Sequence, residues 1–515
     1  MRDAMSEMAP SGGTVRTPPA SAARHQRPGG GPGSREPRAA RGRGRRVAAL
    51  FRPRTRPDRV RALAVAAVAV CVLTGVITAV VFGSIAGGLR QIGDRSDPEV
   101  LATTDLYYRL NDMDAQVANV LLVGAQHGLG VDRQQAQAIY DQDRTQADRD
   151  LQRASAIAGT LPSAQGPLRA VLNGLGRYEA LVGEAVYLDA QGPGLAGRPP
   201  TPALLLYRQA TDLLQDGILP AARGLTDAST LALDRSYQAK RSAALDGALW
   251  VVLAGVALLV ILAGLQIYLA TRFRRLLTPA LAAAFLVAVV LVAGGGTGLL
   301  AQAGHLRVAK SEAFDSIIAL SQAHATSDDA NADESRYLVD PGRAAQYQQA
   351  FENQSQQLAR IPVAGIFHYD AGLAKAIDAY RANHADVRFG GYLGAEFRNI
   401  TFPGERAAAQ KTLAAYQVYE RDDRHIRALN RAGDLRAAIA FDTSYARGNS
   451  NYAFTQYDNA LLAVIAINQH AFNAAITAGQ HGVSGWTGLI PAAAVILIIA
   501  LLLAAVLPRL AEYRE

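Results

Sequence analysis

The stretch that decides the fold is 247–275, which reads GALWVVLAGVALLVILAGLQIYLATRFRR. Up to Thr271 it contains no acidic residue, Lys or Arg, and a helix needs about 20 apolar residues to cross a bilayer. A second uncharged run, 276–306, follows the basic residues at 272–275. A core helix of a soluble protein usually has a shorter apolar run, of about 10–14 residues. The stretch therefore predicts two membrane-spanning helices joined by a short turn.

Two further runs of the same kind lie toward the ends of the chain. We predict four transmembrane helices in all, at 62–89, 247–271, 276–303 and 483–507. A cleaved signal peptide is the alternative for the first run, but its apolar region is too long and a long tail precedes it. We therefore expect an uncleaved anchor.

Basic residues near the span ends predict the orientation in a plasma membrane, because cytoplasmic loops carry an excess of Lys and Arg. The N-terminal tail is rich in Arg, and the turn 272–275 contains three arginines. Both termini and this turn are therefore expected in the cytoplasm, with the stub 508–515 on the same side. The large segments 90–246 and 304–482 are then extracytoplasmic. The residues expected to contact anionic membrane lipids are Arg43, Arg45, Arg46, Arg272, Arg274 and Arg275.

The tail 1–60 is predicted to be disordered, because it is rich in Gly, Pro, Ser, Ala and Arg and has almost no aromatic residues. Residues 1–61 hold 15 Arg and 4 acidic residues, so their net charge is +11, and this exceeds the whole chain's formal charge of +8. The basic excess thus belongs to one end, and it does not indicate nucleic-acid binding. Lipid contact is the simpler role for this tail, and a docking or phosphorylation segment with Thr17 is the alternative.

Both extracytoplasmic segments are predicted to be antiparallel four-helix bundles, so that the fold class is all-α. Apolar residues alternate in steps of four and three along the first segment, which is the spacing of a bundle seam. They are Leu106, Leu110, Met113, Val117 and Val120. We expect the last helix of each bundle to run directly into the next span, and 361–404 to be an insertion in the second bundle.

The chain has the order span, domain, span twice, which indicates an internal duplication. The motif Asp114-Ala115-Gln116-Val117-Ala118-Asn119 follows the first span at an offset similar to that of Asp329-Ala330-Asn331-Ala332 after the third.

Small residues in two of the predicted spans have the spacing of helix-packing motifs. Gly83 and Gly87 lie in the first span, and Gly294 and Gly298 lie in the third. Packing among the four spans of one chain is the simpler interpretation. Association between subunits is the alternative.

No motif of a known catalytic, cofactor-binding or metal site is present, so we expect no enzyme, cofactor or metal. The lone cysteine, Cys71, lies in the first span, and the nine His residues fit no zinc spacing. A group of acidic residues (Asp328, Asp329, Asp333 and Glu334) is expected to form a solvated helix face, with a divalent-ion site as the alternative. Asn468 lies on an apolar seam, where a polar residue usually sets the register.

The stretch from Leu413-Ala414-Ala415-Tyr416 to Arg431-Ala432-Gly433-Asp434-Leu435-Arg436-Ala437-Ala438 resembles the four-helix-bundle ectodomains of bacterial chemoreceptors and sensor kinases. In that family a third helix carrying Tyr ends at a Gly-Asp turn, and a long fourth helix returns to the membrane. Such sensors also carry a cytoplasmic output domain, which we do not expect here. The whole architecture looks like the actinobacterial membrane component that links a glutamate-binding lipoprotein to a soluble serine/threonine kinase.

These features favour a non-enzymatic membrane protein that senses an extracytoplasmic solute or binding protein and relays the signal to a cytoplasmic partner. The resemblance implies a solute-binding protein and a kinase as partners. An envelope scaffold or assembly factor is the alternative. Transport is disfavoured, because the predicted spans contain no charged residue for an ion path.

Overall fold

The computed structural model describes residues 56–93, 97–126, 129–273, 278–362 and 368–511. Every regular element within these ranges is a helix, which confirms the all-α fold class. From Val60 onward the chain forms one compact unit. Residues 1–55 of the predicted disordered tail, with Arg43, Arg45 and Arg46, lie outside the described residues, as do Arg274 and Arg275. Residues 56–60, which were also assigned to the tail, are helical, because the first long helix begins at Arg56.

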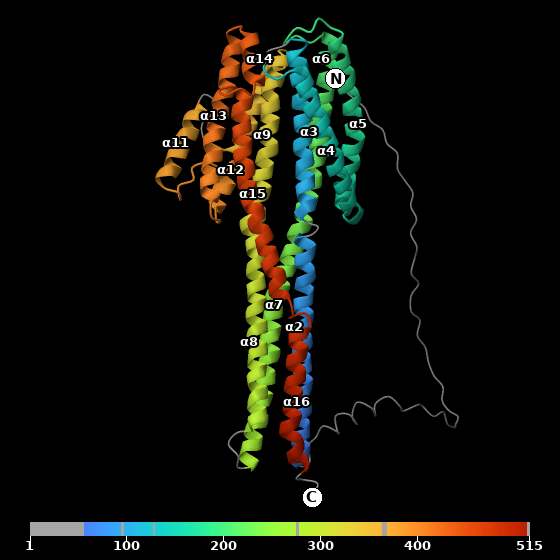
Figure 1. Ribbon diagram of the computed structural model, residues 1–515, viewed down its shortest axis with the longest axis vertical. Coiled ribbons are helices and arrows are strands. Elements are labelled where there is room, and N and C mark those ends of the chain that lie inside the picture. The colour runs from blue at the N-terminus through green and yellow to red at the C-terminus, as the bar shows by residue number, and fades with distance from the viewer. Residues whose placement is uncertain (1–55, 94–96, 127–128, 274–277, 363–367, 512–515) are drawn as a thin grey trace, which may run out of the picture. The chain divides into compact units, whose positions relative to one another are not determined.

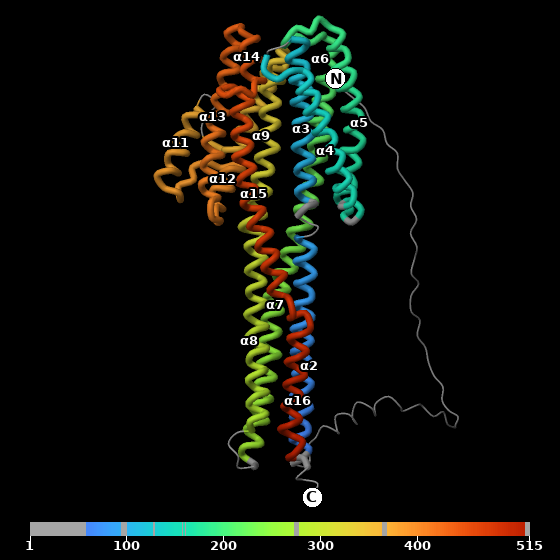
Figure 2. The backbone as a smooth tube through the Cα atoms, in the orientation of Figure 1, coloured from blue at the N-terminus to red at the C-terminus, as the bar shows by residue number. Residues whose placement is uncertain are grey.

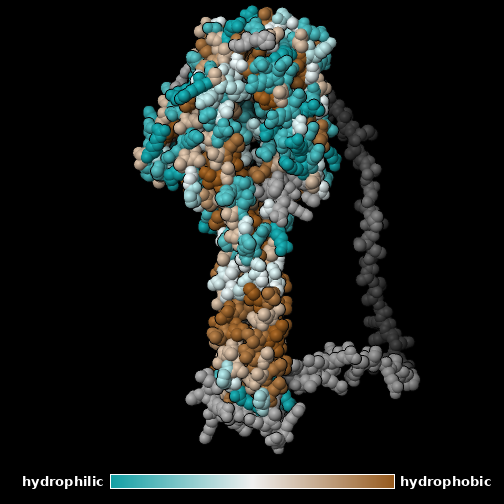
Figure 3. Space-filling model, viewed as in Figure 1, coloured by the Kyte–Doolittle hydropathy of each residue, from teal (hydrophilic) through white to brown (hydrophobic). Residues whose placement is uncertain are grey.

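Four long apolar helices run side by side (Figure 1). They are α2 (Arg56–Gln91), α7 (Leu219–Phe273), α8 (Pro279–Arg307) and α16 (Leu489–Ala511). Their shared core includes Cys71, Leu262 and Leu281, all almost fully buried. Their outer faces expose large apolar side chains, such as Val260 at 65%, and form the brown band in Figure 3. Continuous apolar surface of this kind is not stable in water, so these faces suit contact with lipid.

Five helical stretches among the described residues are long and apolar enough to cross a membrane. The fifth is α15 (Ser450–Val483), which was not predicted as a span. Its side chains Tyr457, Leu461 and Val464 are fully buried against other helices of the second bundle. The apolar face of α15 is therefore a face of a protein core.

The first bundle consists of four helical rods, in agreement with the sequence. They are α3 (Asp97–Val123), α4 (Arg133–Thr160), α5 (Pro162–Ala190) and the rod formed by α6 (Thr201–Leu213), the π-helical turn η2 (Leu214–Ile218) and α7. The predicted seam residues Leu106, Leu110 and Met113 are fully buried in the bundle core. The junction between α2 and α3 falls on 94–96, outside the described residues.

The second bundle starts with a rod in which α8 continues through the π-helical turn η3 (Val308–Phe314) into α9 (Asp315–Val339). Its other helices are α10 (Ala344–Leu358), α13 (Glu405–Arg431), the short α14 (Leu435–Thr443) and α15. The described part of the predicted insertion forms α11 (Tyr369–Ala382) and α12 (Gly391–Asn399). Phe397 of α12 packs edge-to-face against Tyr380 and Phe389 within the insertion. All three belong to the same apolar cluster as Phe351 and Tyr416 of the bundle.

The exits from the two bundles differ. α7 continues without a break from the first bundle into the apolar segment, as predicted. The second bundle departs from the prediction, because the chain turns between α15 and α16. Gly485 occupies this turn with φ of +82°, a backbone conformation that glycine adopts at little cost. A second departure concerns the Gly433-Asp434 turn, after which the resemblance implied a long helix that returns to the membrane. The turn is instead followed by the short helix α14, and the long helix α15 begins only at Ser450.

Candidate functional site

The two bundles meet where α3 packs against α9 (Figures 1 and 2). An arginine is buried at this seam between the bundles. Arg336 of α9 is only 1% exposed. Its Nε and Nη2 lie 2.9 and 2.8 Å from Asp114 Oδ2 of α3. Its Nη1 lies 3.0 Å from Asp329 and 2.7 Å from Asp333. Burial disfavours the charged guanidinium, but the three carboxylates outweigh burial and raise the pKa of Arg336 well above its usual value.

Asp114 collects further hydrogen bonds from the first bundle. Tyr178 of α5 and Tyr207 of α6 donate to its oxygens at 3.1 and 3.2 Å, and Thr211 donates at 3.2 Å. Burial, followed by the charge of Asp114, raises the pKa of both tyrosines well above the usual value, so they remain donors. The charge of Asp114 is therefore compensated by groups from both bundles, as a buried carboxylate requires.

Asp329 also accepts hydrogen bonds from side chains of both bundles. Gln215 of η2 donates to one of its oxygens at 2.8 Å, and Gln354 of α10 donates to the other at 2.7 Å. The two similar motifs that begin at Asp114 and Asp329 thus contribute carboxylates to the same guanidinium.

The acidic residues of α9 correct the sequence-based expectation of a solvated helix face, which is wrong. Asp328, Asp329, Asp333 and Glu334 are between 1% and 6% exposed. The physical reason is that α9 is a central helix, in contact with α3, α10, α12, α13, α14 and α15. Burial raises the pKa of Asp333 to about 7 despite the nearby Arg336.

A second group of buried charges lies beside the seam in the second bundle. Arg427 donates to Asp423 at 2.9 Å within α13. The hydroxyl of Ser335 of α9 lies 2.8 Å from Asn119 Oδ1 of the first bundle and 3.0 Å from Asp442 Oδ2 of α14, and it can donate its single proton to either oxygen. Burial raises the pKa of Asp442 to about 7. The seam is therefore polar and hydrogen-bonded around Arg336.

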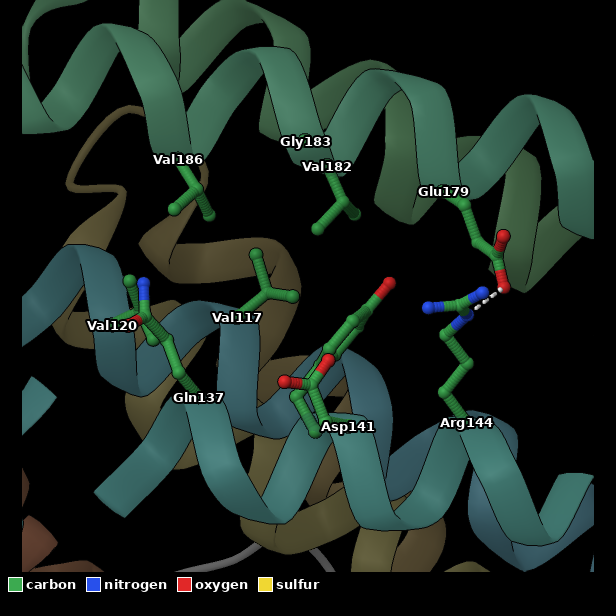
Figure 4. A pocket seen from close by; sticks show the side chains of 10 residues that line it. Val117, Val120, Gln137, Asp141, Arg144, Glu179, Val182, Gly183 and Val186 are labelled. Atoms are coloured by element: carbon green, nitrogen blue, oxygen red, sulfur yellow. Dashed lines mark hydrogen bonds and ion pairs between the residues drawn. The ribbon is translucent and has the colours of Figure 1, made fainter. Parts of the chain in front are cut away.

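A cavity of about 430 Å³ opens within the first bundle (Figure 4). Val182 and Val186 of α5 point toward Val117 of α3 on its apolar side. At one end Arg144 of α4 pairs with Glu179 of α5 at 3.0 Å. The volume and the mixture of apolar and charged walls fit a small organic molecule.

The two predicted helix-packing pairs have different surroundings. A Cβ added to Gly294 would lie 2.9 Å from the ring of Trp486, and one added to Gly298 would lie 3.1 Å from Phe82 of α2. A Cβ on Gly83 or Gly87 of α2 would meet nothing within 4 Å among the described residues. Gly294 and Gly298 thus face other parts of the chain. Subunit association stays the alternative interpretation for Gly83 and Gly87. Lipid contact by Arg272, whose side chain is not described, stays a prediction.

Comparison with known proteins bears on the first bundle. Residues 88–238 match the actinobacterial sensor domain family. The matched segment contains Asp114, Tyr178 and Tyr207 and all residues that line the cavity of Figure 4. Searches of curated proteins and of solved structures found no similar protein. The match supports the predicted sensor domain of actinobacterial type.

Proposed function

We propose that the protein is a non-enzymatic membrane sensor that detects an extracytoplasmic solute or binding protein and relays this event to a cytoplasmic partner. The observation that carries the proposal is helix continuity. The rod α6–η2–α7 and the rod α8–η3–α9 both run from the polar seam into the apolar segments. A rotation or shift of a bundle must therefore move the apolar helices, which is a known form of signalling transition.

Contacts at the ends of the bundles that adjoin the apolar segments would allow a helix movement to pass between these two rods. Lys310 of η3 lies 2.8 Å from Asp234 of α7 and also pairs with Asp315. The carboxylates outweigh the effect of burial and raise the pKa of Lys310. Phe314 and Leu233 belong to the apolar cluster beside this ion pair. The two rods are thus tied together just where they leave the bundles.

For the topology we propose four spans, α2, α7, α8 and α16, with both termini in the cytoplasm of a plasma membrane. The distribution of arginines supports this orientation. The buried apolar face of α15 supports its assignment to the second bundle rather than to the bilayer. The partners that we propose are a solute-binding protein outside the membrane and a kinase inside it.

In-cell crosslinking of the full-length protein, followed by purification and identification of the bound proteins, tests the relay. Joint recovery of a solute-binding protein and a kinase is the expected result. The variant Lys310→Met should lower the response of the kinase to the solute, while Lys411→Met, on an exposed site of α13, should leave it unchanged. Recovery of envelope proteins without a kinase would contradict the relay and favour a scaffold.

A further inference from the structure

A second cavity lies between the two bundles, and none of the features above uses it. Its volume is about 220 Å³, and its walls come from α3 and α7 of the first bundle and from α9 and α12 of the second. Tyr392 of α12 brings the inserted segment to the cavity wall. A ligand in this cavity would touch both of the rods that continue into the apolar segments.

One wall carries a guanidinium without a carboxylate partner. Arg223 of α7 is exposed at the cavity, and its Nη2 donates to the hydroxyl of Tyr107. The guanidinium also lies over the ring of Tyr107, 4.8 Å from its centroid. Burial and the nearby Asp329 raise the pKa of Tyr107 to about 12, so this partner stays neutral. No described carboxylate forms an ion pair with Arg223, which leaves a positioned positive charge facing the cavity.

A negative charge, the carboxylate of Asp227, lies one helical turn from Arg223 on α7. Asp227 follows Arg223 by four residues on α7, so the two side chains lie on the same face, about 6 Å apart at Cβ. Asp227 is also exposed, and no described cation pairs with it. The cavity therefore presents one cation and one anion at neighbouring positions.

Three threonines complete the polar wall, and each is less than 7% exposed. Thr104 donates to the Val100 carbonyl at 3.0 Å and Thr226 donates to the Ala222 carbonyl at 3.4 Å, so their oxygens can only accept a further hydrogen bond. Thr326 of α9 has no hydrogen-bond partner among the described residues, and its hydroxyl can donate to a ligand. The wall thus offers acceptors for an ammonium group and a donor for a carboxylate.

We propose that this cavity binds a small zwitterion of the amino-acid class, with its carboxylate at Arg223 and Thr326 and its ammonium at Asp227. A simple carboxylate would be repelled by Asp227, and a simple amine would be repelled by Arg223. Only a ligand with both charges pairs with both groups. The volume suits a small ligand, since it is below the range of about 300–1,000 Å³ for drug-sized molecules.

Bound in this way, the ligand would link α7 to α9 across the seam. Arg223 and Asp227 belong to the rod that continues to Phe273, and Thr326 belongs to the rod that begins at Pro279. Binding would fix the spacing of the two rods. This signalling consequence rests on the proposed function, whereas the binding itself does not.

The test is thermal unfolding and calorimetric titration of the full-length protein in lipid nanodiscs. The probes are the proteinogenic amino acids, tested one at a time, with acetate and methylamine as ligands of single charge. At least one amino acid is expected to raise the Tm and to bind, and the two single-charge ligands are expected to do neither. Failure of every amino acid to bind would overturn the proposal.

Variants locate the site. Arg223→Gln and Thr326→Val should each weaken binding about tenfold or more, which corresponds to ~1.4 kcal/mol. Arg235→Gln, an exposed change further along α7, should bind as the wild type does. Arg144→Gln makes the same change in the cavity of Figure 4 and tests whether the ligand binds there instead.

Loss of binding in Arg144→Gln with full binding in Arg223→Gln would overturn the assignment of the ligand to the cavity between the bundles. Binding without any change in kinase recovery would contradict only the relay.

Discussion

Arg336 and Asp114 form an ion pair at 2.8 Å although 222 residues separate them in the sequence. Both side chains are almost completely buried, and they belong to different bundles. The pair therefore fixes the position of α9 against α3, and it makes the seam between the bundles a defined structure rather than a loose contact.

The variant Arg336→Met is expected to destabilise the protein by about 3–5 kcal/mol, because it leaves buried carboxylates without a counter-charge. Arg381→Met is the matched control, since Arg381 and its partner Asp378 are 58% and 74% exposed. Its expected cost is below about 1 kcal/mol. Denaturant unfolding of both variants gives the comparison. Equal losses in the two variants would show that the buried pair does not stabilise the seam.

Protonation of Glu396 is expected to make stability depend on pH. Glu396 of α12 is 1% exposed, and burial raises its pKa from 4.5 to about 8. The folded state therefore holds a proton that the unfolded state loses. This contribution is complete below about pH 4.5 and is lost as the pH rises through 8. Tm should fall between pH 5 and pH 8.

Glu396→Gln tests that contribution, since glutamine has the shape of the neutral acid. It should raise the Tm relative to the wild type at pH 8 and leave it nearly unchanged at pH 5. A gain of a few degrees is expected, at about 2–4 °C per kcal/mol. Glu184→Gln on an exposed site of α5 should leave the profile unchanged. A pH profile that is identical in wild type and Glu396→Gln would contradict the assignment.

The turn between α15 and α16 should depend on Gly485. Alanine at this position meets a strained φ of +82°, and its Cβ would lie 3.1 Å from Ile490. We expect Gly485→Ala to cost about 1 kcal/mol or more. Gly488→Ala in the same turn has open space around its Cβ and is the control. Thermal unfolding followed by circular dichroism measures both, and a larger loss in Gly488→Ala would contradict the turn geometry.

The two glycine pairs should respond differently to a larger side chain. Gly298→Leu must displace Phe82 and is expected to cost about 1–3 kcal/mol by overpacking. Gly87→Leu has no neighbour within 4 Å and should leave the stability of a single chain unchanged. Chemical crosslinking of both variants reports the oligomeric state. A smaller oligomer in Gly87→Leu alone would support the alternative role in subunit association.

Features that depend on local sequence were predicted well. The apolar runs identify α2, α7, α8 and α16 because bilayer thickness sets a length that a charged residue interrupts. The face of α3 that is buried within the first bundle follows from the alternating steps of three and four between its apolar residues. One local signal was missed: Arg336 follows Asp333 by three residues and Asp329 by seven, on the same helix face. That spacing predicts an ion cluster on one face of the helix, whereas burial of the cluster depends on the helices that cover this face.

The sequence alone determined the helical class, the apolar segments and the division into two bundles, since these follow from the length and periodicity of single segments. Tertiary structure alone decided that α9 is central, that Arg336 reaches Asp114, and that Arg223 and Thr326 line one cavity. The physical reason is that a helical repeat specifies which face of a helix is buried. It does not specify which helix covers that face, and burial and counter-charge both depend on that neighbour.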